Sequence, residues 1–175
     1  MKKLNLIALA WLFIFGQSAF ANSAELAPEL QVFAPYLGTW EAEFDTPPGK
    51  PKMTDVSTSE RHLNGKAIRT THSINDGVYG GESIIFFDKE KQKLVFYYFT
   101  TADFFTNGTI DVLEDGSFVA YEDVIGNENG ITKVKSTSKM VAGKMQISTS
   151  YLKNGKWTEP EYRTYSRSDK AVVFK

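Results

Sequence analysis

His72 is the side chain in this sequence with the widest choice of chemistry, because an imidazole can ligate haem iron, bind a metal ion or anchor a polar ligand group. The chain has only two histidines. Side chains alternate between the two faces of an extended segment, so His72 shares a face with Ile68 and Ile74, and we predict that it points inward. His62 then falls on the opposite face, which disfavours a two-histidine zinc site. A hydrogen-bonded core or rim histidine is the plainer interpretation and stays open.

Four tyrosines on extended segments could place hydroxyl groups in the same interior: Tyr98, Tyr121, Tyr151 and Tyr162. A phenol joins a large apolar ring to a polar tip, which suits ligand contact and ordinary sheet packing equally well. Arg69 would add a positive charge that could orient a polar ligand group. We therefore predict that His72, Arg69 and the four tyrosines form a ligand-binding set. We predict no metal site and no resident cofactor, with haem on His72 as the alternative.

The sequence shows no catalytic signature. Its acids fall on different predicted strands and loops, whereas paired-carboxylate chemistry needs two of them at a set separation in one cleft. The acids considered are Asp55, Glu60, Glu82, Asp103, Asp111, Glu122 and Asp123. Nucleophile-elbow, glycine-rich phosphate-loop and Cys–His patterns do not occur in the sequence. We predict no catalytic residue and favour a binding protein over an enzyme.

The elements that must position these side chains are short strands separated by Asx-Gly turns. Glycine, and Asn or Asp beside it, tolerate the positive φ that tight hairpin turns require. The pairs are Asn64-Gly65, Asp76-Gly77, Asn107-Gly108, Asp115-Gly116, Asn129-Gly130 and Asn154-Gly155. Between them lie runs rich in β-branched and aromatic residues, which favour a pleated, half-buried surface. These runs predict strands at 38–45, 53–63, 66–75, 82–88, 93–101, 108–113, 117–124, 131–140, 144–152, 156–166 and 170–174.

Turns recurring at such spacing are typical of a β-sandwich or an up-and-down barrel. We predict an all-β fold, a single antiparallel up-and-down barrel of about 10 strands with a short N-terminal helix. The apolar residues of that helix recur at helical spacing, at Leu26, Leu30, Phe33 and Leu37. Pro28 suits its first turn and Pro35 its end. Such a helix could close one end of the barrel.

Treating the Asx-Gly pairs as two-residue turns predicts which residues face each other across a hairpin. The predicted cross-strand pairs include Glu60–Arg69, Ile110–Tyr121, Ile147–Tyr162 and Leu152–Trp157. The first is an ion pair, and the second and third place Tyr121 and Tyr162 on the core face. A slip of one residue would exchange the two faces of a strand.

The N-terminus has the three parts of a bacterial secretory signal. Lys2 and Lys3 supply positive charge, residues 4–15 are apolar except for Asn5, and Ala19-Phe20-Ala21 gives the small-x-small cleavage pattern. The apolar run is shorter than the roughly 20 residues that a spanning helix needs. We predict a cleaved signal peptide at 1–21, a single β-barrel domain at 22–175, and a periplasmic or secreted location.

Composition limits the partners. The formal net charge is −1 at pH 7, which is too weak to indicate nucleic acid, and without cysteine the fold must rest on its core alone. We also predict no integral membrane span after signal cleavage. Residues 84–87 and 93–99 are apolar on both strand faces, although the outside of a barrel wall should be more polar. This pattern predicts either a second covered surface, such as a homodimer contact or the packed helix, or an overfilled core.

The segment Gly38-Thr39-Trp40, directly after the predicted helix, resembles the G-x-W signature of lipocalins and other calycins. In that family the tryptophan closes the base of the barrel, and an arginine near the end of the last strand packs across its ring. The resemblance implies this structural role for Trp40, with Arg163 or Arg167 as the arginine.

More widely, residues 30–167 resemble a bacterial family of exported domains of unknown function with calycin/lipocalin-like β-barrels. The resemblance rests on the G-x-W, on Asn64-Gly65-Lys66-Ala67-Ile68, and on Gly80-Gly81-Glu82 before an aromatic strand. It implies a calycin-like barrel. The predicted number of strands is similar to that of the ten-stranded fatty-acid-binding proteins and nitrobindin-like haem proteins.

These observations together predict an exported, non-catalytic β-barrel that binds a small apolar or amphipathic ligand. Aromatic walls would bury the ligand, and a few polar groups would orient it. Two alternatives stay open: a haem or metal-centre protein resembling nitrobindin, and a structural or assembly factor of the cell envelope that acts through its aromatic strands.

Overall fold

The computed structural model describes residues 25–175 apart from 45, 47–48, 50 and 126–129. The predicted signal peptide at 1–21 therefore lies outside the described residues, and so does Asn129 of one predicted turn. Two short 3₁₀ helices and a series of strands follow one another in this order: η1 (Pro28–Tyr36), β1 (Gly38–Phe44), β2 (Met53–His62), η2 (Leu63–Gly65), β3 (Ala67–Ile74), β4 (Tyr79–Asp88), β5 (Lys93–Thr100), β6 (Phe105–Val112), β7 (Phe118–Asp123), β8 (Ile131–Val141), β9 (Lys144–Lys153), β10 (Lys156–Trp157) and β11 (Glu161–Arg167).

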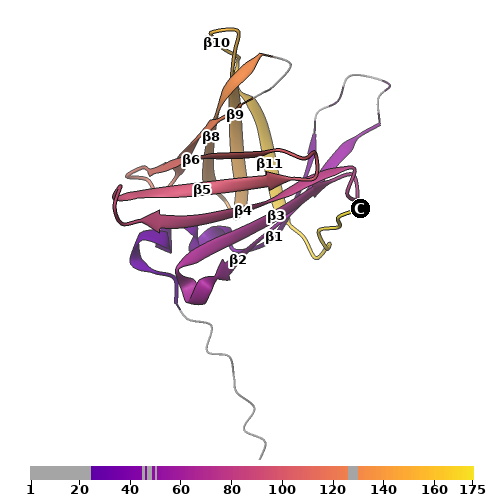
Figure 1. Ribbon diagram of the computed structural model, residues 1–175. Helices are drawn as coiled ribbons and strands as arrows, with labels where there is room; N and C mark the ends of the chain where they lie inside the picture. Colours follow the sequence, from indigo (N-terminus) through magenta and orange to yellow (C-terminus); the bar gives the residue numbers. More distant parts are fainter. Residues whose placement is uncertain (1–24, 45, 47–48, 50, 126–129) are drawn as a thin grey trace, which may run out of the picture.

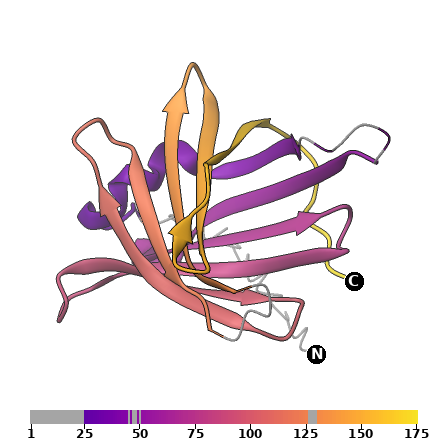
Figure 2. The same ribbon diagram turned by 90° about the horizontal axis from the view of Figure 1, so that it is seen from above.

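The strands form one antiparallel sheet that closes on itself (Figure 1). From β1 to β9 each strand pairs with the next strand along the chain, and β11 lies between β9 and β1. The short β10 pairs with β9. The result is a closed antiparallel barrel of ten strands, and Figure 2 shows these strands surrounding a common interior. The predicted fold class, an all-β up-and-down barrel with a short N-terminal helix, is confirmed.

The predicted strand at 170–174 is wrong, because these residues run as irregular chain after β11. Closure of the barrel explains the difference: β11 already has β9 on one side and β1 on the other, so no free edge is left for a further strand. The end of the chain lies against the outside of β3 and β4 instead. The backbone N–H of Val173 donates to the hydroxyl of Ser73 at 3.3 Å, and the Phe174 ring packs close to Gly80.

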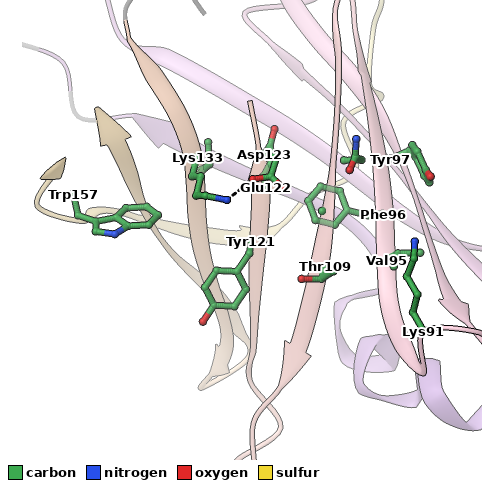
Figure 3. Close-up of a pocket in the computed structure, with 13 residues that line it drawn as sticks. Lys91, Val95, Phe96, Tyr97, Thr109, Tyr121, Glu122, Asp123, Lys133 and Trp157 are labelled. Atoms are coloured by element: carbon green, nitrogen blue, oxygen red, sulfur yellow. Dashed lines mark hydrogen bonds and ion pairs between the residues drawn. The ribbon is translucent and has the colours of Figure 1, made fainter. Parts of the chain in front are cut away.

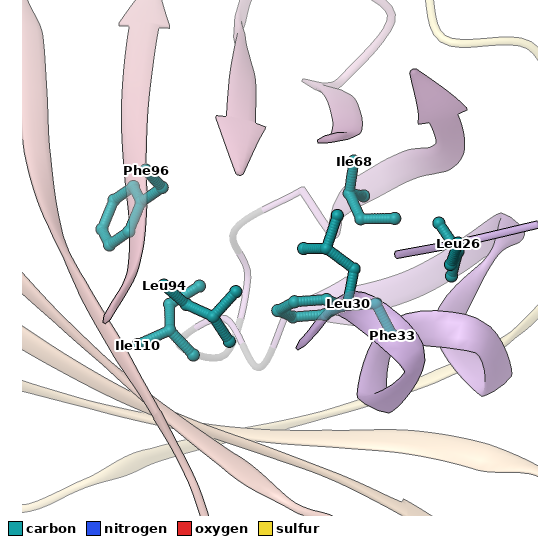
Figure 4. Packing of buried hydrophobic residues seen from close by; sticks show 7 residues of the cluster. All are labelled: Leu26, Leu30, Phe33, Ile68, Leu94, Phe96 and Ile110. Carbon is teal, nitrogen blue, oxygen red and sulfur yellow. The ribbon is translucent and has the colours of Figure 1, made fainter. Parts of the chain in front are cut away.

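The helix η1 closes one end of the barrel. Leu30 and Phe33 on η1, and Leu26 just before it, are buried in one apolar cluster with strand residues that include Ile68 and Ile110 (Figure 4). All four residues of the predicted apolar stripe belong to this cluster or pack against it, with Leu30 and Phe33 on η1, Leu26 before it and Leu37 after it. Burying these side chains excludes water from this end of the barrel and provides much of the driving force for folding.

Trp40 lies on β1 directly after this helix and is only 1 % exposed. Its indole N–H donates to the backbone oxygen of Tyr36 at 2.7 Å, which ties the strand to the helix. The Arg167 guanidinium carbon lies 3.8 Å from the centre of the indole ring. The contact expected from the lipocalin resemblance is therefore made by Arg167. Arg163 lies over the ring of Phe44 instead, at 4.4 Å.

Gly38 is required for this arrangement. Its φ is +105°, and a side chain there would collide with the guanidinium of Arg167. The same guanidinium donates to the backbone oxygens of Pro35, in the last turn of η1, and of Leu37, the residue after the helix. The G-x-W pattern therefore has a physical meaning here: the glycine leaves room for the arginine that joins the tryptophan to the end of the helix.

Two of the four predicted cross-strand pairs are confirmed, Glu60–Arg69 and Leu152–Trp157. The pair Ile110–Tyr121 is wrong, because Ile110 faces Ala120 and Tyr121 faces Thr109. The loop explains this slip. Its closing hydrogen bond joins the N–H of Leu113 to the oxygen of Ser117 at 2.8 Å, so an odd number of residues separates the strands. Gly116, with φ +77°, supplies the left-handed residue that such a loop needs.

The predicted pair Ile147–Tyr162 is also wrong, because Ile147 faces Arg163 and Tyr162 faces Ser148. The turn at Asn154-Gly155 has the expected register, but β10 ends at Trp157 and residues 158–160 intervene before β11. This interruption shifts the register by one residue, and a shift of one residue exchanges the two faces of a strand.

The predicted turn at Asn107-Gly108 is wrong, because both residues lie inside β6. Gly108 has another role there. It faces Phe96 on β5 and Glu122 on β7, and a side chain on it would collide with the Phe96 ring and with the oxygen of Tyr121. A glycine within a strand often marks such a close approach.

Candidate functional site

The barrel interior contains a cavity of about 470 Å³. It begins at the side chains of η1 and the cluster around Ile68, and it extends toward Phe44 at the opposite end of β1. Its wall next to η1 is apolar. The remaining wall is rich in polar groups from several strands, and they are Asp55, Ser57, Ser59, Thr70, His72, Tyr79, Ser83, Tyr98, Glu122, Ser136, Ser138, Thr149, Tyr151, Arg163 and Tyr165.

A chain of hydrogen bonds runs along the polar wall and centres on His72. The Nδ1 atom of His72 lies 3.0 Å from Asp55 Oδ1, and its Nε2 lies 2.7 Å from the hydroxyl of Tyr98. The Tyr98 hydroxyl in turn lies 3.0 Å from that of Tyr79. At the other end, the hydroxyl of Tyr165 donates to Asp55 Oδ2 at 2.8 Å. Residues from β2, β3, β4, β5 and β11 thus form one connected network.

Asp55 sets the direction of the hydrogen bonds in this network. A carboxylate only accepts, so Asp55 accepts hydrogen bonds from the Tyr165 hydroxyl and from the Nδ1–H of His72. In neutral His72 the Nε2 atom is then an acceptor, and the Tyr98 hydroxyl donates to it. Burial raises the pKa of Tyr98 and of Tyr165, which keeps both phenols protonated and able to donate. Each donor in the network therefore points toward Asp55.

Gly81 makes the central contact of the network geometrically feasible. It lies on β4 directly beside His72 of β3, and a side chain there would collide with the Tyr98 ring of β5. Without that side chain the Tyr98 ring can cover β4 and reach His72 on the strand beyond. The sequence did contain this signal, as the Gly80-Gly81 pair, but the spacing alone did not indicate which ring it accommodates.

Glu122 is the second acid of the cavity, and sequence reasoning did not select it for a role in binding. It lies on β7 and accepts a hydrogen bond from the Thr106 hydroxyl at 2.5 Å. Burial raises the pKa of Glu122. In the described part of the chain it forms no ion pair. A correct register at the Asp115-Gly116 loop would have placed it inside, because it shares a face with Ala120.

The predicted ligand-binding residues divide into two groups. His72, Tyr98 and Tyr151 line the cavity, as predicted. Tyr121 and Tyr162 are on the outer surface, 41 % and 75 % exposed, so their predicted interior position is wrong. The reason in both cases is the one-residue register shift described above.

Arg69 is also on the outside of the barrel, so its predicted position beside a ligand is wrong. It lies between Glu60 and Glu82, with N–O distances of 3.1 and 2.6 Å. The alternation of side chains along β3 explains this. The neighbouring residues Ile68 and Thr70 line the cavity, so Arg69 between them points outward. The arginine that does reach the cavity is Arg163.

A second, smaller hollow of about 290 Å³ lies on the outer face of β5 to β8 (Figure 3). Tyr97, Tyr121 and Trp157 stand around it, and an ion pair of 2.5 Å between Lys133 and Asp123 crosses one side. Gly108, Phe96 and Glu122 also contribute to its lining. This hollow is separate from the polar network, whose residues face the other side of the same wall.

Among the described residues, no group of three or more His, Asp or Glu side chains is arranged to hold a metal ion. Over the same part of the chain, no helix combines the length and the apolar character needed to cross a bilayer.

Comparison with known proteins supports the fold and goes no further. No family model and no curated protein matches the chain. Among solved structures, the chain is similar to the crystal structure of Rv2717c from M. tuberculosis, with a TM-score of 0.59 and 14 % sequence identity. The match covers 82 % of this chain and 99 % of that one. At this identity the likeness concerns the barrel fold alone.

Proposed function

We propose that this protein is an exported, non-catalytic barrel that binds a small amphipathic molecule in its interior. The observation that carries the proposal is the cavity of about 470 Å³, which is apolar beside η1 and polar along the His72 wall. Small-molecule sites in proteins usually measure roughly 300–1,000 Å³ and combine apolar walls with a few placed polar groups. The cavity volume corresponds to on the order of fifteen water molecules.

The division of the wall argues for an amphipathic ligand. A wholly apolar molecule would cover Glu122 without offering its carboxylate a further polar partner, which is unfavourable for a charged group. A wholly polar molecule would gain little from the apolar side chains of Phe33, Ile68 and Phe96. A ligand with an apolar body and a polar end satisfies both parts of the wall.

The arrangement around His72 supports binding over catalysis. Both ring nitrogens are engaged, one with Asp55 and the other with Tyr98. An Asp–His–hydroxyl series can activate a nucleophile, but burial raises the pKa of Tyr98, which disfavours the phenolate. The network is therefore suited to fixing a donor and acceptor pattern on the cavity wall.

Haem is the alternative ligand, and the same contacts bear on it. An axial bond from Nε2 of His72 would require Tyr98 to move away from that nitrogen. A Soret band that appears on addition of haem and disappears in His72→Ala would favour haem. The absence of a band in the wild type would end this alternative.

A matched pair of substitutions tests the proposal directly. Ser136 on β8 lines the cavity, whereas Ser150 on β9 faces outward beside Lys135. Ser136→Phe should fill part of the cavity and lower the affinity for a fluorescent fatty-chain probe by tenfold or more. A tenfold loss corresponds to about 1.4 kcal/mol of binding free energy. Ser150→Phe adds the same group outside and should leave uptake unchanged. Equal uptake by both variants, or no uptake by the wild type, would count against an interior site.

The export part of the proposal rests on the first 21 residues. Expressed in a bacterium with its full N-terminus, the mature protein should begin at Asn22 and appear in the periplasmic or extracellular fraction. Retention of Met1 with the cytoplasmic fraction would contradict export. The homodimer stays a prediction, and sedimentation of the mature protein at low concentration tests it.

A further inference from the structure

We propose that the cavity selects a ligand whose polar end is a positively charged amine or quaternary ammonium, held by Glu122 among the rings of Tyr98, Tyr151 and Phe96. This inference rests on the proposed function and adds the charge of the ligand to it. Two observations support it. The other charged side chains of the cavity already have partners, and aromatic rings surround Glu122, which does not.

Four side chains that carry or can carry a charge line the cavity: Asp55, His72, Glu122 and Arg163. Asp55 is matched by His72 and by the hydroxyl of Tyr165. The guanidinium of Arg163 lies 3.0 Å from Glu161 and stacks on the Phe44 ring. In the described residues, only Glu122 among the four has neither an ion pair nor a hydrogen bond with another titratable side chain. The free charge of the cavity is therefore negative.

The position of Glu122 places aromatic rings on both sides of it. Thr106, which donates to the carboxylate, is the cross-strand partner of Tyr98. On the other side, Val134 is the partner of Glu122 on β8, and Tyr151 is the partner of Val134 on β9. All of these side chains except Thr106 and Val134 line the same cavity.

The glycine of β6 brings a third ring to the same place. Gly108 lies directly between Phe96 and Glu122 in the sheet, and the Phe96 ring covers the space that a side chain at 108 would occupy. Aromatic faces attract cations, best where water is excluded. A carboxylate next to several rings is thus a typical environment for an organic ammonium group, and it would repel a carboxylate ligand.

The burial of Glu122 is also consistent with a cationic ligand. Burial raises the pKa of Glu122, so the ionised form is disfavoured by its surroundings. A bound cation would favour that form again. The hydroxyl of Thr106 offers a neutral donor only, which leaves the ion-pairing position of the carboxylate for a ligand.

Three probes with one chain and different ends test the charge preference. They are decyltrimethylammonium, decanoate and decanol, titrated into the mature protein below their micelle-forming concentrations and followed by calorimetry. The wild type should bind the ammonium probe tightest and decanoate weakest. Glu122→Gln should weaken the ammonium probe by about tenfold, as expected for a lost ion pair beside aromatic rings, and leave decanol unchanged.

The adjacent acid provides the matched control. Asp123 lies next in β7 but faces outward, where it pairs with Lys133. Asp123→Asn should change none of the three affinities. Thermal unfolding of both variants shows whether the fold is retained. Thr106→Val is a second test variant, because it leaves the carboxylate in place but removes its hydrogen-bond donor. It should lose less affinity for the ammonium probe than Glu122→Gln does.

The outcomes separate this inference from the proposed function. If decanol or decanoate binds but the ammonium probe binds no tighter than decanoate, the inference fails and the interior site stands. The inference also fails if Glu122→Gln and Asp123→Asn bind the ammonium probe equally well. If none of the three probes binds the wild type, the proposed function fails and the inference with it.

Discussion

Tyr98 joins the two parts of the polar network, and replacing it with phenylalanine removes one hydroxyl and little else. That hydroxyl lies 2.7 Å from Nε2 of His72 and 3.0 Å from the hydroxyl of Tyr79. In Tyr98→Phe, His72 loses its donor and Tyr79 loses its acceptor. Each hydrogen bond contributes about 0.5–1.5 kcal/mol, so the two together correspond to about 1–3 kcal/mol. Because both groups line the cavity, water can take over part of their bonding, and we expect about 1–2 kcal/mol.

Urea unfolding followed by tryptophan fluorescence measures this loss. The midpoint of Tyr98→Phe should fall by about 0.5–1 M relative to the wild type, for a slope typical of small domains. Tyr162→Phe is the control, since Tyr162 is 75 % exposed and its hydroxyl should contribute less than about 0.5 kcal/mol. Equal free energies of unfolding for the two variants would refute the network as described.

Three further substitutions test other parts of the structure. Burial raises the pKa of Glu122 in the folded protein. The contribution of Glu122 to the free energy of unfolding is therefore most favourable below its unfolded pKa of about 4.3, and it is lost as pH rises through the higher folded pKa. Glu122→Gln should therefore unfold at higher urea than the wild type at pH 8, and the two midpoints should converge at pH 4. Gly81→Ala should destabilise the protein by about 1–3 kcal/mol in urea, because its Cβ would lie 2.8 Å from Tyr98 Cζ and force that ring to move. Arg167→Gln should lose the contact with Trp40, worth about 0.5–2 kcal/mol, and should shift the tryptophan emission spectrum of the folded protein.

The fold could be predicted because its signals are local. Alternating side chains and glycine-containing turns define strands over a few residues, and the strands have few ways to close into a barrel. The apolar spacing from Leu26 to Phe33 likewise identified the helix that covers one end. The G-x-W pattern at Trp40 added a long-range contact, since the resemblance limited its partner to Arg163 or Arg167.

The site was harder to predict because it depends on the parity of single loops. The odd-numbered loop around Gly116 moved Tyr121 outward and Glu122 inward, and the interruption before β11 did the same to Tyr162 and Arg163. An Asx-Gly pair does not reveal this, since Asn107-Gly108 lies inside a strand and Asp115-Gly116 in a loop of odd length. Because side chains alternate along a strand, a register error of one residue assigns every residue of that strand to the wrong face.

The volume of the cavity could not be predicted either. It depends on the room left after all interior side chains are packed, and in particular on Gly81 and Gly108, which leave room for the rings of Tyr98 and Phe96. Composition reports how many aromatic residues exist but not which of them fold back against the wall.

The most direct test of an interior binding site is a set of nuclear Overhauser effects between a decyl-chain probe and isoleucine methyl groups of the protein. Ile68, Ile85 and Ile110 line the cavity, whereas Ile84, the residue next to Ile85, faces outward opposite Arg69. An interior binding site predicts contacts from the probe to Ile68, Ile85 and Ile110 and none to Ile84. Contacts to Ile84 without contacts to Ile85 would place the probe on the outer wall and contradict it.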